Sequence, residues 1–343
     1  MIEGFDRITG LGLIDSAPLL ATESACQMLR EACAESSWRV LQVLEAEIVK
    51  EKPERRRTLR YRVVAGRVRG GDVGAAREVT WYAKHYRGSR GKRVFSLLRS
   101  LQSLAPDVLT PDPIGYSPKL RLLVMGALEG STFSEALEDS AGIGASVSQA
   151  GRALARIHKS GTLRHPDYLT AHGPREEIGV LELAQRLASN SPGFPGPAGA
   201  FLELCSAVEG ELAQEAPLRQ ALLHRDFHPG QILFSRDSAG IGVLDWDDAA
   251  LGEPELDLGN LEAHLFLDDL QRRGSIESAP SLAGALQAGY LAQGEISFTR
   301  LATYRRAALL RLATLERLAD PRISVLDWES LARGLTEIAL RKH

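Results

Sequence analysis

Residues 222–234, LLHRDFHPGQILF, place a polar segment between two short apolar ones. Apolar runs of this length, bounded by turn residues such as Pro and Gly, are typical of short buried strands. The segment between them carries ionisable and amide side chains, namely His224, Arg225, Asp226, His228 and Gln231. Because burying such groups without partners is costly, we interpret the segment as a functional loop held by the two strands.

A second carboxylate follows another apolar run further along the chain. Asp245 comes after residues 241–244, IGVL, and stands 19 positions after Asp226 (245 − 226). If the strands before them are adjacent and antiparallel, both carboxylates reach one edge, where they repel each other unless a cation lies between them. Gln231 adds a neutral carbonyl oxygen, and Mg²⁺ accepts a site of few protein oxygens completed by water and phosphate. The pattern predicts a divalent-metal site at Gln231 and Asp245, beside Asp226.

The order of these residues matches a known catalytic template with one difference. Enzymes of the protein kinase type carry H-x-D-x-x-x-x-N followed by a metal-binding Asp, and here the residues are His224, Asp226, Gln231 and Asp245. Gln231 stands where the template has Asn. Because Gln carries the same carbonyl oxygen on one more methylene group, we expect it to remain a ligand and to alter metal preference or rate. The strand lysine of the template corresponds to Lys84, in the run WYAKHY.

Over residues 222–265 the chain resembles the aminoglycoside phosphotransferase and choline kinase-like family. That family typically shows H-G-D-x-H-P-x-N, then I-D-W, then D-P-x-x-D-L, and this chain has HRDFHPGQ, LDW and EPELDL. The resemblance implies an α+β, bilobal protein kinase-like fold. It places a strand-rich, nucleotide-binding N-lobe at residues 1–125, with a leading helix at 21–35. Residues 126–343 would form a mainly helical C-lobe that holds the catalytic and acceptor-binding groups.

The resemblance also implies roles for the residues of the polar segment. Asp226 would be the catalytic base that accepts or orients the proton of a substrate hydroxyl. His224 would support this loop, and Arg225 would flank it. Gln231 and Asp245 would hold Mg²⁺, which bridges the phosphates of the nucleotide.

Further roles follow from the same resemblance for residues on either side of this segment. Lys84 would contact the α- and β-phosphates of ATP or GTP. Backbone groups near Met125 and Leu128 would take the adenine edge. His228 would flank the catalytic loop, and Asp257 would anchor that loop or a helix N-terminus without reacting.

The N-terminal half departs from the kinase template in the helix that should pair with the strand lysine. The predicted helix within residues 87–104 contains no acid to bind Lys84. In protein kinases a Glu of this helix makes that ion pair. Glu23, Glu31 and Glu35 of the leading helix are therefore open alternatives as its partner.

The first hairpin also lacks the G-x-G-x-x-G run that covers the phosphates in protein kinases. Its turn, residues 50–57, reads KEKPERRR, and residues 50–99 hold 16 Lys/Arg against 4 Asp/Glu, a net charge of +12 (16 − 4). We expect Lys52, Arg55 and Arg56 to cover the phosphates with side-chain charge in place of backbone amides.

Two further segments of the N-terminal half are predicted to be loops. Residues 65–76, AGRVRGGDVGAA, are Gly-rich and polar, and residues 105–118, APDVLTPDPIGYSP, contain four prolines. Gly and Pro interrupt regular structure, the first through its backbone freedom and the second through its missing N–H. The apolar run at 120–128 is predicted to be a short buried strand.

Composition limits the classes of partner and compartment. No apolar run approaches the roughly 18–20 residues that span a bilayer, and the N-terminus does not read as a secretory signal. Three cysteines without metal-ligand spacing are typical of free thiols in a reducing cytoplasm. Aromatic residues make up only 6% of the chain, and its acidic half would repel a phosphate backbone. We therefore expect a cytoplasmic protein with no membrane or nucleic-acid partner.

These observations together predict an enzyme that transfers the γ-phosphoryl group of ATP or GTP to a hydroxyl of a small acceptor, such as a sugar or an aminoglycoside-like molecule. Residues 237–270 hold ten acids and no Lys or Arg, which favours a cationic acceptor; a neutral sugar is the alternative. Gln231 and the missing helix acid motivate a different hypothesis, a nucleotide-binding pseudokinase that acts as a regulatory module. Nucleotidyl transfer is a third possibility.

Overall fold

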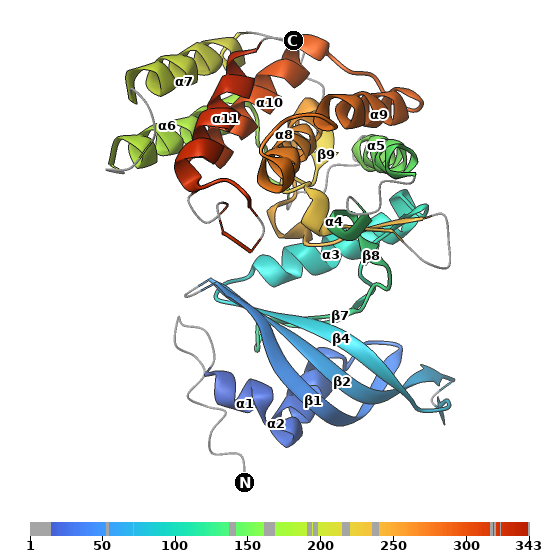
Figure 1. The fold of residues 1–343 in the computed structure, drawn as a ribbon. Helices are drawn as coiled ribbons and strands as arrows, with labels where there is room; N and C mark the ends of the chain where they lie inside the picture. The colour runs from blue at the N-terminus through green and yellow to red at the C-terminus, as the bar shows by residue number, and fades with distance from the viewer. Residues whose placement is uncertain are drawn as a thin grey trace. The chain divides into compact units, whose positions relative to one another are not determined.

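The computed structural model describes residues 15–52, 55–70, 72–136, 142–160, 169–190, 194, 198–214, 220–234, 240–315, 318, 320–322 and 324–341. The chain forms two compact units, Met1–Glu129 and Gly130–His343 (Figure 1). Antiparallel strands dominate the first unit, and helices dominate the second. The predicted α+β architecture, with a strand-rich N-terminal part and a helical C-terminal part, is confirmed.

The N-terminal unit is built on one antiparallel sheet of strand order β1-β2-β4-β7-β6, with β3 beside β2. Its strands are β1 (Trp38–Lys52), β2 (Arg56–Arg69), β3 (Asp72–Val73), β4 (Arg77–Tyr86), β6 (Pro113–Ser117) and β7 (Leu122–Gly126). The unit also contains the short strand β5 (Val108–Leu109) and the helices α1 (Ser16–Leu20), α2 (Thr22–Ala32) and α3 (Arg90–Leu104).

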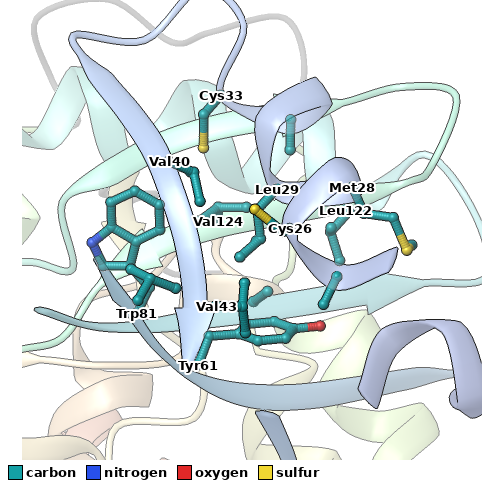
Figure 2. Close-up of a cluster of buried hydrophobic side chains, with 14 of the residues drawn as sticks. Cys26, Met28, Leu29, Cys33, Val40, Val43, Tyr61, Trp81, Leu122 and Val124 are labelled. Carbon is teal, nitrogen blue, oxygen red and sulfur yellow. The ribbon is translucent and has the colours of Figure 1, made fainter. Parts of the chain in front are cut away.

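One face of this sheet is apolar and covered by helix. Because successive side chains of a strand point to opposite faces, Tyr61 of β2 and its neighbours Trp81 and Ala83 of β4 share one face. There they join Leu29 and other buried residues of α2 in an apolar core (Figure 2). The Tyr61 hydroxyl donates a hydrogen bond of 2.9 Å to the carbonyl oxygen of Leu19, which fixes α1 beside this core.

The opposite face carries polar and charged side chains and receives α3. Lys84 belongs to this face, with Thr58 as its cross-strand neighbour on β2 and Leu123 on β7. Gly91 of α3 lies so close to the sheet that a Cβ there would come within 2.7 Å of Tyr116 and 2.8 Å of Tyr86. Because only glycine permits this approach, the first turn of α3 lies directly against the end of β4.

Both segments predicted as loops contribute strands, which corrects the sequence analysis. β2 continues to Arg69 and pairs with β3, so much of 65–76 belongs to the sheet. Within 105–118, β6 pairs with β7. β6 is the edge strand and starts at Pro113, where a missing N–H is tolerated. At Gly115 a Cβ would lie 2.2 Å from the carbonyl oxygen of Ala32, so this glycine lets α2 approach.

The C-terminal unit is a bundle of helices around a few short strands. Its helices are α4 (Phe133–Ala136), α5 (Ile143–Ser160), α6 (Pro174–Asn190), α7 (Ala198–Leu212), α8 (Glu255–Arg273), α9 (Ala279–Leu291), α10 (Phe298–Ala313) and α11 (Trp328–Leu340). Glycines allow α5 and α9 to touch: a Cβ on Gly151 would lie 2.2 Å from the Leu286 carbonyl oxygen, and one on Gly289 would lie 1.9 Å from the Ser148 carbonyl oxygen. The backbone packing of this pair places the end of α5 beside the short strands.

The short strands of this unit are β8 (Ser131–Thr132), β9 (Ala221–Leu223), β10 (Ile232–Phe234), β11 (Ile241–Val243) and β12 (Ala250–Gly252). Two single 3₁₀ turns, at Pro229–Gln231 and Trp246–Asp248, lie between them. Among the described residues no helix has both the length and the apolar composition needed to cross a bilayer. The cysteines Cys26, Cys33 and Cys205 are free and buried, and burial raises the pKa of the Cys33 thiol to about 12.

Candidate functional site

Two small ladders determine where the predicted catalytic residues lie. β9 pairs with β12, whereas β10 pairs with β11. The chain therefore passes from one ladder to the other twice, through the Asp226 loop (residues 224–231) and through the Asp245 loop (residues 244–249). The expectation that the strands before Asp226 and Asp245 pair with each other is wrong, because they belong to different ladders. The two loops are brought together because both connect the same pair of ladders.

Hydrogen bonds through Leu244 join the two loops directly. His224 Nε2 lies 2.6 Å from the carbonyl oxygen of Leu244 and donates to it, since a carbonyl can only accept. The backbone N–H of Leu244 donates to the carbonyl oxygen of Gln231 at 2.8 Å. The His224 ring is fully buried and packs edge-on against Trp246, with 4.9 Å between ring centroids. Because Leu244 is bonded to Gln231, the backbone of the following residue, Asp245, is fixed close to the end of the Asp226 loop.

Asp257, in the first turn of α8, holds the start of the Asp226 loop. Its carboxylate accepts the backbone N–H groups of His224 and Arg225, each at 2.7 Å. It also lies 3.1 Å from Nε2 of His158 on α5, and Nδ1 of that ring lies 2.8 Å from the hydroxyl of Tyr290 on α9. Burial alone would raise the pKa of Asp257, but the hydrogen bond from His158 and the other nearby donors lower it below its usual value. The predicted anchoring role of Asp257 is confirmed.

Two of the three described non-Gly residues with positive φ lie in these loops, and the third is Arg121 of the N-terminal unit. φ is 68° at Arg225 and 53° at Asp245, in the left-handed region that L-residues other than Gly, Asn and Asp rarely adopt. For an Arg side chain this conformation costs about 1–3 kcal/mol and persists only where the surroundings enforce it. At Arg225 the enforcing contact is the hydrogen bond from its N–H to Asp257. Strain held in this way is typical of functional sites.

The predicted base, Asp226, lies on the loop with its side chain 41% exposed, open to a reactant. Its Oδ2 is 3.8 Å from Nε2 of His228. The other ring nitrogen of His228, Nδ1, accepts the backbone N–H of Gly230 at 3.1 Å. The loop backbone is also held by Asn260 of α8, whose Nδ2 donates to the carbonyl oxygen of Phe227 at 3.0 Å.

The donor atoms of the predicted metal site fit Mg²⁺ chemically. Gln231 and Asp245 lie on loops that are hydrogen-bonded to each other, and they offer an amide and a carboxylate oxygen. A hard cation of this size takes such oxygens from one or two protein groups and fills its remaining positions with water and phosphate. Among the described residues no cluster of three or more His, Cys, Asp or Glu side chains suits a metal ion held by protein alone.

Helices contribute loop contacts that the sequence analysis did not identify. His158, Asn260 and His264 contact the Asp226 loop or its anchor, and Tyr290 contacts His158. On α8 a signal was present, because residues 257, 260 and 264 are polar positions spaced by three and four residues within a largely buried helix. On α5 and α9 a lone His and a lone Tyr gave no such signal.

Four of the ten acids of the run 237–270 form ion pairs with arginines. The ion pairs are Glu253–Arg300, Glu262–Arg305, Asp268–Arg272 and Asp269–Arg273. Asp257 is satisfied by the loop backbone, as described above. Two of the arginines come from α10, far along the chain, so the run appeared unpaired in sequence. The charge from which a cationic acceptor was inferred is therefore partly neutralised within the C-terminal unit.

Three of the predicted phosphate-binding residues share one face of the N-terminal sheet. Lys52 pairs with Arg56 across the β1–β2 hairpin, and Thr58, two residues after Arg56, pairs with Lys84. Lys84 and Arg56 are only 7% and 6% exposed. Arg55 lies in the exposed hairpin turn, of which residues 53 and 54 fall outside the described residues. Lys52, Arg56 and Lys84 thus lie on one face of the sheet.

The acids offered as partners for Lys84 lie on the wrong side of the sheet. Glu23 and Glu31 belong to α2, and Glu35 follows that helix, whereas α2 packs on the face opposite to Lys84. Glu31 instead accepts a hydrogen bond of 2.8 Å from the Ser117 hydroxyl. The leading helix is therefore part of the structural core of this unit.

The predicted adenine-binding segment includes the end of β7, which lies beside β4 in the sheet. Met125 pairs with Tyr82, two residues before Lys84 and on the same face, and Leu128 follows the end of β7. A hollow of about 550 Å³ lies in the same unit, but it is lined by the start of β4, Trp38, Arg67 and residues 126–127. Lys84, Met125 and Leu128 are not among its lining residues.

The profile of the phosphotransferase enzyme family matches residues 35–310, which include every predicted site residue. Comparison with curated proteins found no significant match. Among solved structures the fold is similar to an amicoumacin kinase in complex with AMP-PNP, Ca²⁺ and Ami (TM-score 0.64, 15% identity, 92% of each chain). It is also similar to a choline kinase from Cryptosporidium parvum (0.58, 11%, 87% of this chain and 88% of that chain).

A macrolide 2'-phosphotransferase from Brachybacterium faecium is similar as well (TM-score 0.54, 18% identity, 91% of this chain and 98% of that chain). At these identities the structural likeness shows the fold, and it agrees with the protein kinase-like fold expected from the sequence. The family profile covers far more than half of the chain and includes both the Lys84 strand and the two loops. The chain therefore belongs to the phosphotransferase enzyme family and is an ATP-dependent small-molecule kinase.

Proposed function

We propose that this enzyme transfers the γ-phosphoryl group of ATP or GTP to a hydroxyl group of a small-molecule acceptor. The observation that carries the proposal is the link between the Asp226 loop and the Asp245 loop through His224 and Leu244. It holds one exposed carboxylate as a base next to a pair of oxygen donors suited to a nucleotide-bound metal.

In the proposed reaction Asp226 accepts the proton of the acceptor hydroxyl. The acceptor oxygen then forms a bond to the γ-phosphorus, the bond from that phosphorus to the β–γ bridging oxygen breaks, and the nucleoside diphosphate leaves with the electron pair. In a loose transition state the acceptor hydroxyl must be oriented more than it must be deprotonated early, so Asp226 acts mainly by orienting it. Arg225 and His224 keep the loop in place from either side of Asp257.

Gln231 and Asp245 would hold Mg²⁺, which would neutralise charge on the phosphates. On the other unit, Lys84 would bind the α- and β-phosphates, and Lys52, Arg55 and Arg56 would add positive charge near them. The backbone near Met125 and Leu128 would contact the base. A helix acid opposite Lys84 is not needed in this scheme, since the phosphates themselves supply the negative charge.

The acceptor is proposed to be a hydroxyl-bearing metabolite, either an amino sugar or a neutral sugar. Support for a cationic acceptor now rests on the acids of the two loops, since most other acids of the run are paired. A screen of amino sugars, neutral sugars and amino alcohols, with ADP or GDP release as readout, will separate these classes.

The test uses the full chain with Mg-ATP and Mg-GTP, each acceptor in turn, and an Asp226→Asn variant as control. We expect one acceptor class to raise ADP release by about a hundredfold or more over water, and the variant to lose this increase while still binding nucleotide. Retention of the increase in Asp226→Asn would exclude Asp226 as the base. Mass spectrometry of the product distinguishes phosphoryl from nucleotidyl transfer.

A further inference from the structure

One face of helix α8 contacts successive residues of the Asp226 loop. Asp257 binds the backbone at the start of the loop, and Asn260 binds the carbonyl oxygen of Phe227. Further along the helix the ring of His264 stacks on the ring of His228, with 5.0 Å between centroids and 29° between planes. Positions 257, 260 and 264 are spaced by three and four residues and so lie on one side of the helix. Only the third of these contacts reaches a side chain of the loop.

The hydrogen bonds of His228 determine which of its nitrogens carries the proton. The backbone N–H of Gly230 donates to Nδ1 at 3.1 Å, so Nδ1 is an acceptor and the proton of the neutral ring lies on Nε2. Nε2 is 3.8 Å from Oδ2 of Asp226 and 3.4 Å from Nε2 of the Gln231 side-chain amide. The N–H of this ring therefore faces both the proposed base and a proposed metal ligand.

We propose that His264 is a positioning residue: its ring, stacked on His228, holds the Nε2–H of His228 toward the Asp226 carboxylate and the Gln231 amide. This inference rests on the function proposed above. At 3.8 Å the N–H does not form a hydrogen bond with Asp226, but its dipole attracts the carboxylate and favours one orientation of it.

The same geometry assigns an orientation to Gln231. In the structure the side-chain nitrogen of Gln231 faces Nε2 of His228. Because Nε2 of His228 is a donor, we assign the carbonyl oxygen Oε1 to this position, which requires a half-turn of the amide. A carbonyl oxygen has two lone pairs, so one remains for a metal ion. This pairing also gives a reason for Gln at position 231, since its extra methylene extends the amide toward His228.

The surroundings of His264 suit a stacking role. Burial, then the neighbouring His228 and Arg311, lower the pKa of His264 well below its usual value, so a neutral ring faces His228. Arg311 itself donates to Oδ1 of Asn260 at 2.5 Å and is held beside the same face of α8. A neutral His264 ring can stack on His228 without the repulsion that two imidazolium rings would feel.

The first test is spectroscopic and needs no acceptor. Long-range ¹H–¹⁵N spectra of the imidazole rings distinguish Nε2–H from Nδ1–H tautomers, and a His228→Gln variant assigns the signal of His228. We expect His228 to be the Nε2–H tautomer in the wild type and in His264→Phe, which keeps a flat ring. In His264→Leu, which fills the space without a ring to stack, we expect a mixture of tautomers. An Nδ1–H tautomer in the wild type, or an unchanged signal in His264→Leu, overturns the proposal.

The second test uses kinetics with Mg-ATP as substrate and either the acceptor found by screening or water as the phosphoryl acceptor. We expect His264→Leu to lower kcat about tenfold, which corresponds to about 1.4 kcal/mol of barrier, with KM for ATP changed less than about twofold. His264→Phe should restore most of kcat. Arg272→Ala, a surface change on the same helix, is the matched control and should behave as the wild type.

The outcomes separate this inference from the proposed function. If Asp226→Asn keeps full turnover, the proposed base is wrong. If Asp226→Asn is inactive while His264→Leu keeps the wild-type kcat, the positioning role of His264 is wrong and the proposed function stands. Melting temperatures of all variants show whether a loss of kcat reflects unfolding.

Discussion

His224 Nε2 donates a hydrogen bond of 2.6 Å to the carbonyl oxygen of Leu244, and this bond ties the loop of the proposed base to the loop of the proposed metal ligand. Because Asp257 fixes the backbone N–H of the same histidine, the position of Asp245 depends on α8 through His224. The buried His224 residue is thus bonded to α8 through its backbone and to the Asp245 loop through its ring.

Replacing His224 by Ala is expected to reduce both activity and stability. The change removes the donor to Leu244 and leaves a cavity beside Trp246, so we expect a loss of about 2–4 kcal/mol in unfolding free energy. kcat for phosphoryl transfer should fall by about tenfold or more. Urea unfolding and steady-state kinetics measure the two effects. His172→Gln, a change at a buried histidine that contacts Glu177 instead, should affect stability with little effect on kcat; equal kcat in both variants would contradict the role of His224.

The stability of the N-terminal unit should depend on pH through His85. This ring is fully buried, and neither nitrogen has a hydrogen-bond partner among the described residues. Burial, then the charges of Arg121 and Arg57, lower its pKa to about 4. In the unfolded chain His85 takes up a proton near pH 6.5, whereas in the folded protein it does so only near pH 4. The contribution of His85 to the free energy of unfolding is therefore fully present above pH 6.5 and is lost as the pH falls from 6.5 to 4.

The loss should reach about 3 kcal/mol at the acid end of this window. Urea unfolding at several pH values between 7 and 4 measures it, and His85→Leu should show a shallower decrease because it lacks the titrating ring. Titrations shared by both proteins cancel in the difference between them. Parallel pH profiles for the two proteins would show that His85 does not titrate in this way.

Substitutions at Gln231 test its proposed role as a metal ligand. Gln231→Asn keeps a carbonyl oxygen and shortens the side chain, so we expect retained activity with a changed ratio of Mg²⁺ to Mn²⁺ activation. Gln231→Ala removes the oxygen and should lower kcat by about a hundredfold or more. Kinetics across a series of metal concentrations provide the measurement. Near-normal kcat and metal dependence in Gln231→Ala would exclude metal binding by this residue.

The basic hairpin end is expected to contribute to nucleotide binding. Arg55 is exposed in the turn, so Arg55→Glu should fold normally and raise KM for ATP by about tenfold through repulsion of the phosphates. For the buried Arg56 a neutral change to Gln is the milder probe, with a rise in the same direction. Arg69→Glu, at the far end of β2 and also exposed, is the control. An unchanged KM in both Arg55→Glu and Arg56→Gln would remove these residues from the phosphate site.

Local patterns of the sequence were sufficient for the general fold and for the choice of loop residues. The spacing of His224, Asp226 and Gln231 reflects the fixed length of one loop, and Asp245 follows the next apolar run. Both features can be read directly from the sequence. The apolar runs around it are strands, as predicted. The prediction of secondary structure was wrong where a strand is stabilised by its neighbour. β6 contains Pro and Gly and was predicted to be a loop, yet it forms a strand because β7 supplies its hydrogen bonds.

Contacts between distant segments could not be predicted in this way. The acids of 237–270 looked like an open negative surface, but arginines of α10, which start at position 300, neutralise two of them. The acids suggested as partners of Lys84 belong to or follow α2, which packs on one face of the sheet, whereas strand alternation places Lys84 on the other face. In each case the deciding neighbour lies tens of residues away along the chain.

By itself the sequence determined the fold class and the residues that we propose carry the chemistry, because catalytic loops are short and their side-chain types and spacing are visible in a single stretch. Tertiary structure alone decided that β9 and β10 belong to different ladders, that Lys84 faces away from α2, and that His264 stacks on His228. The physical reason is that strand partners and helix faces are selected by burial of apolar surface across the whole unit, and no local segment contains that information.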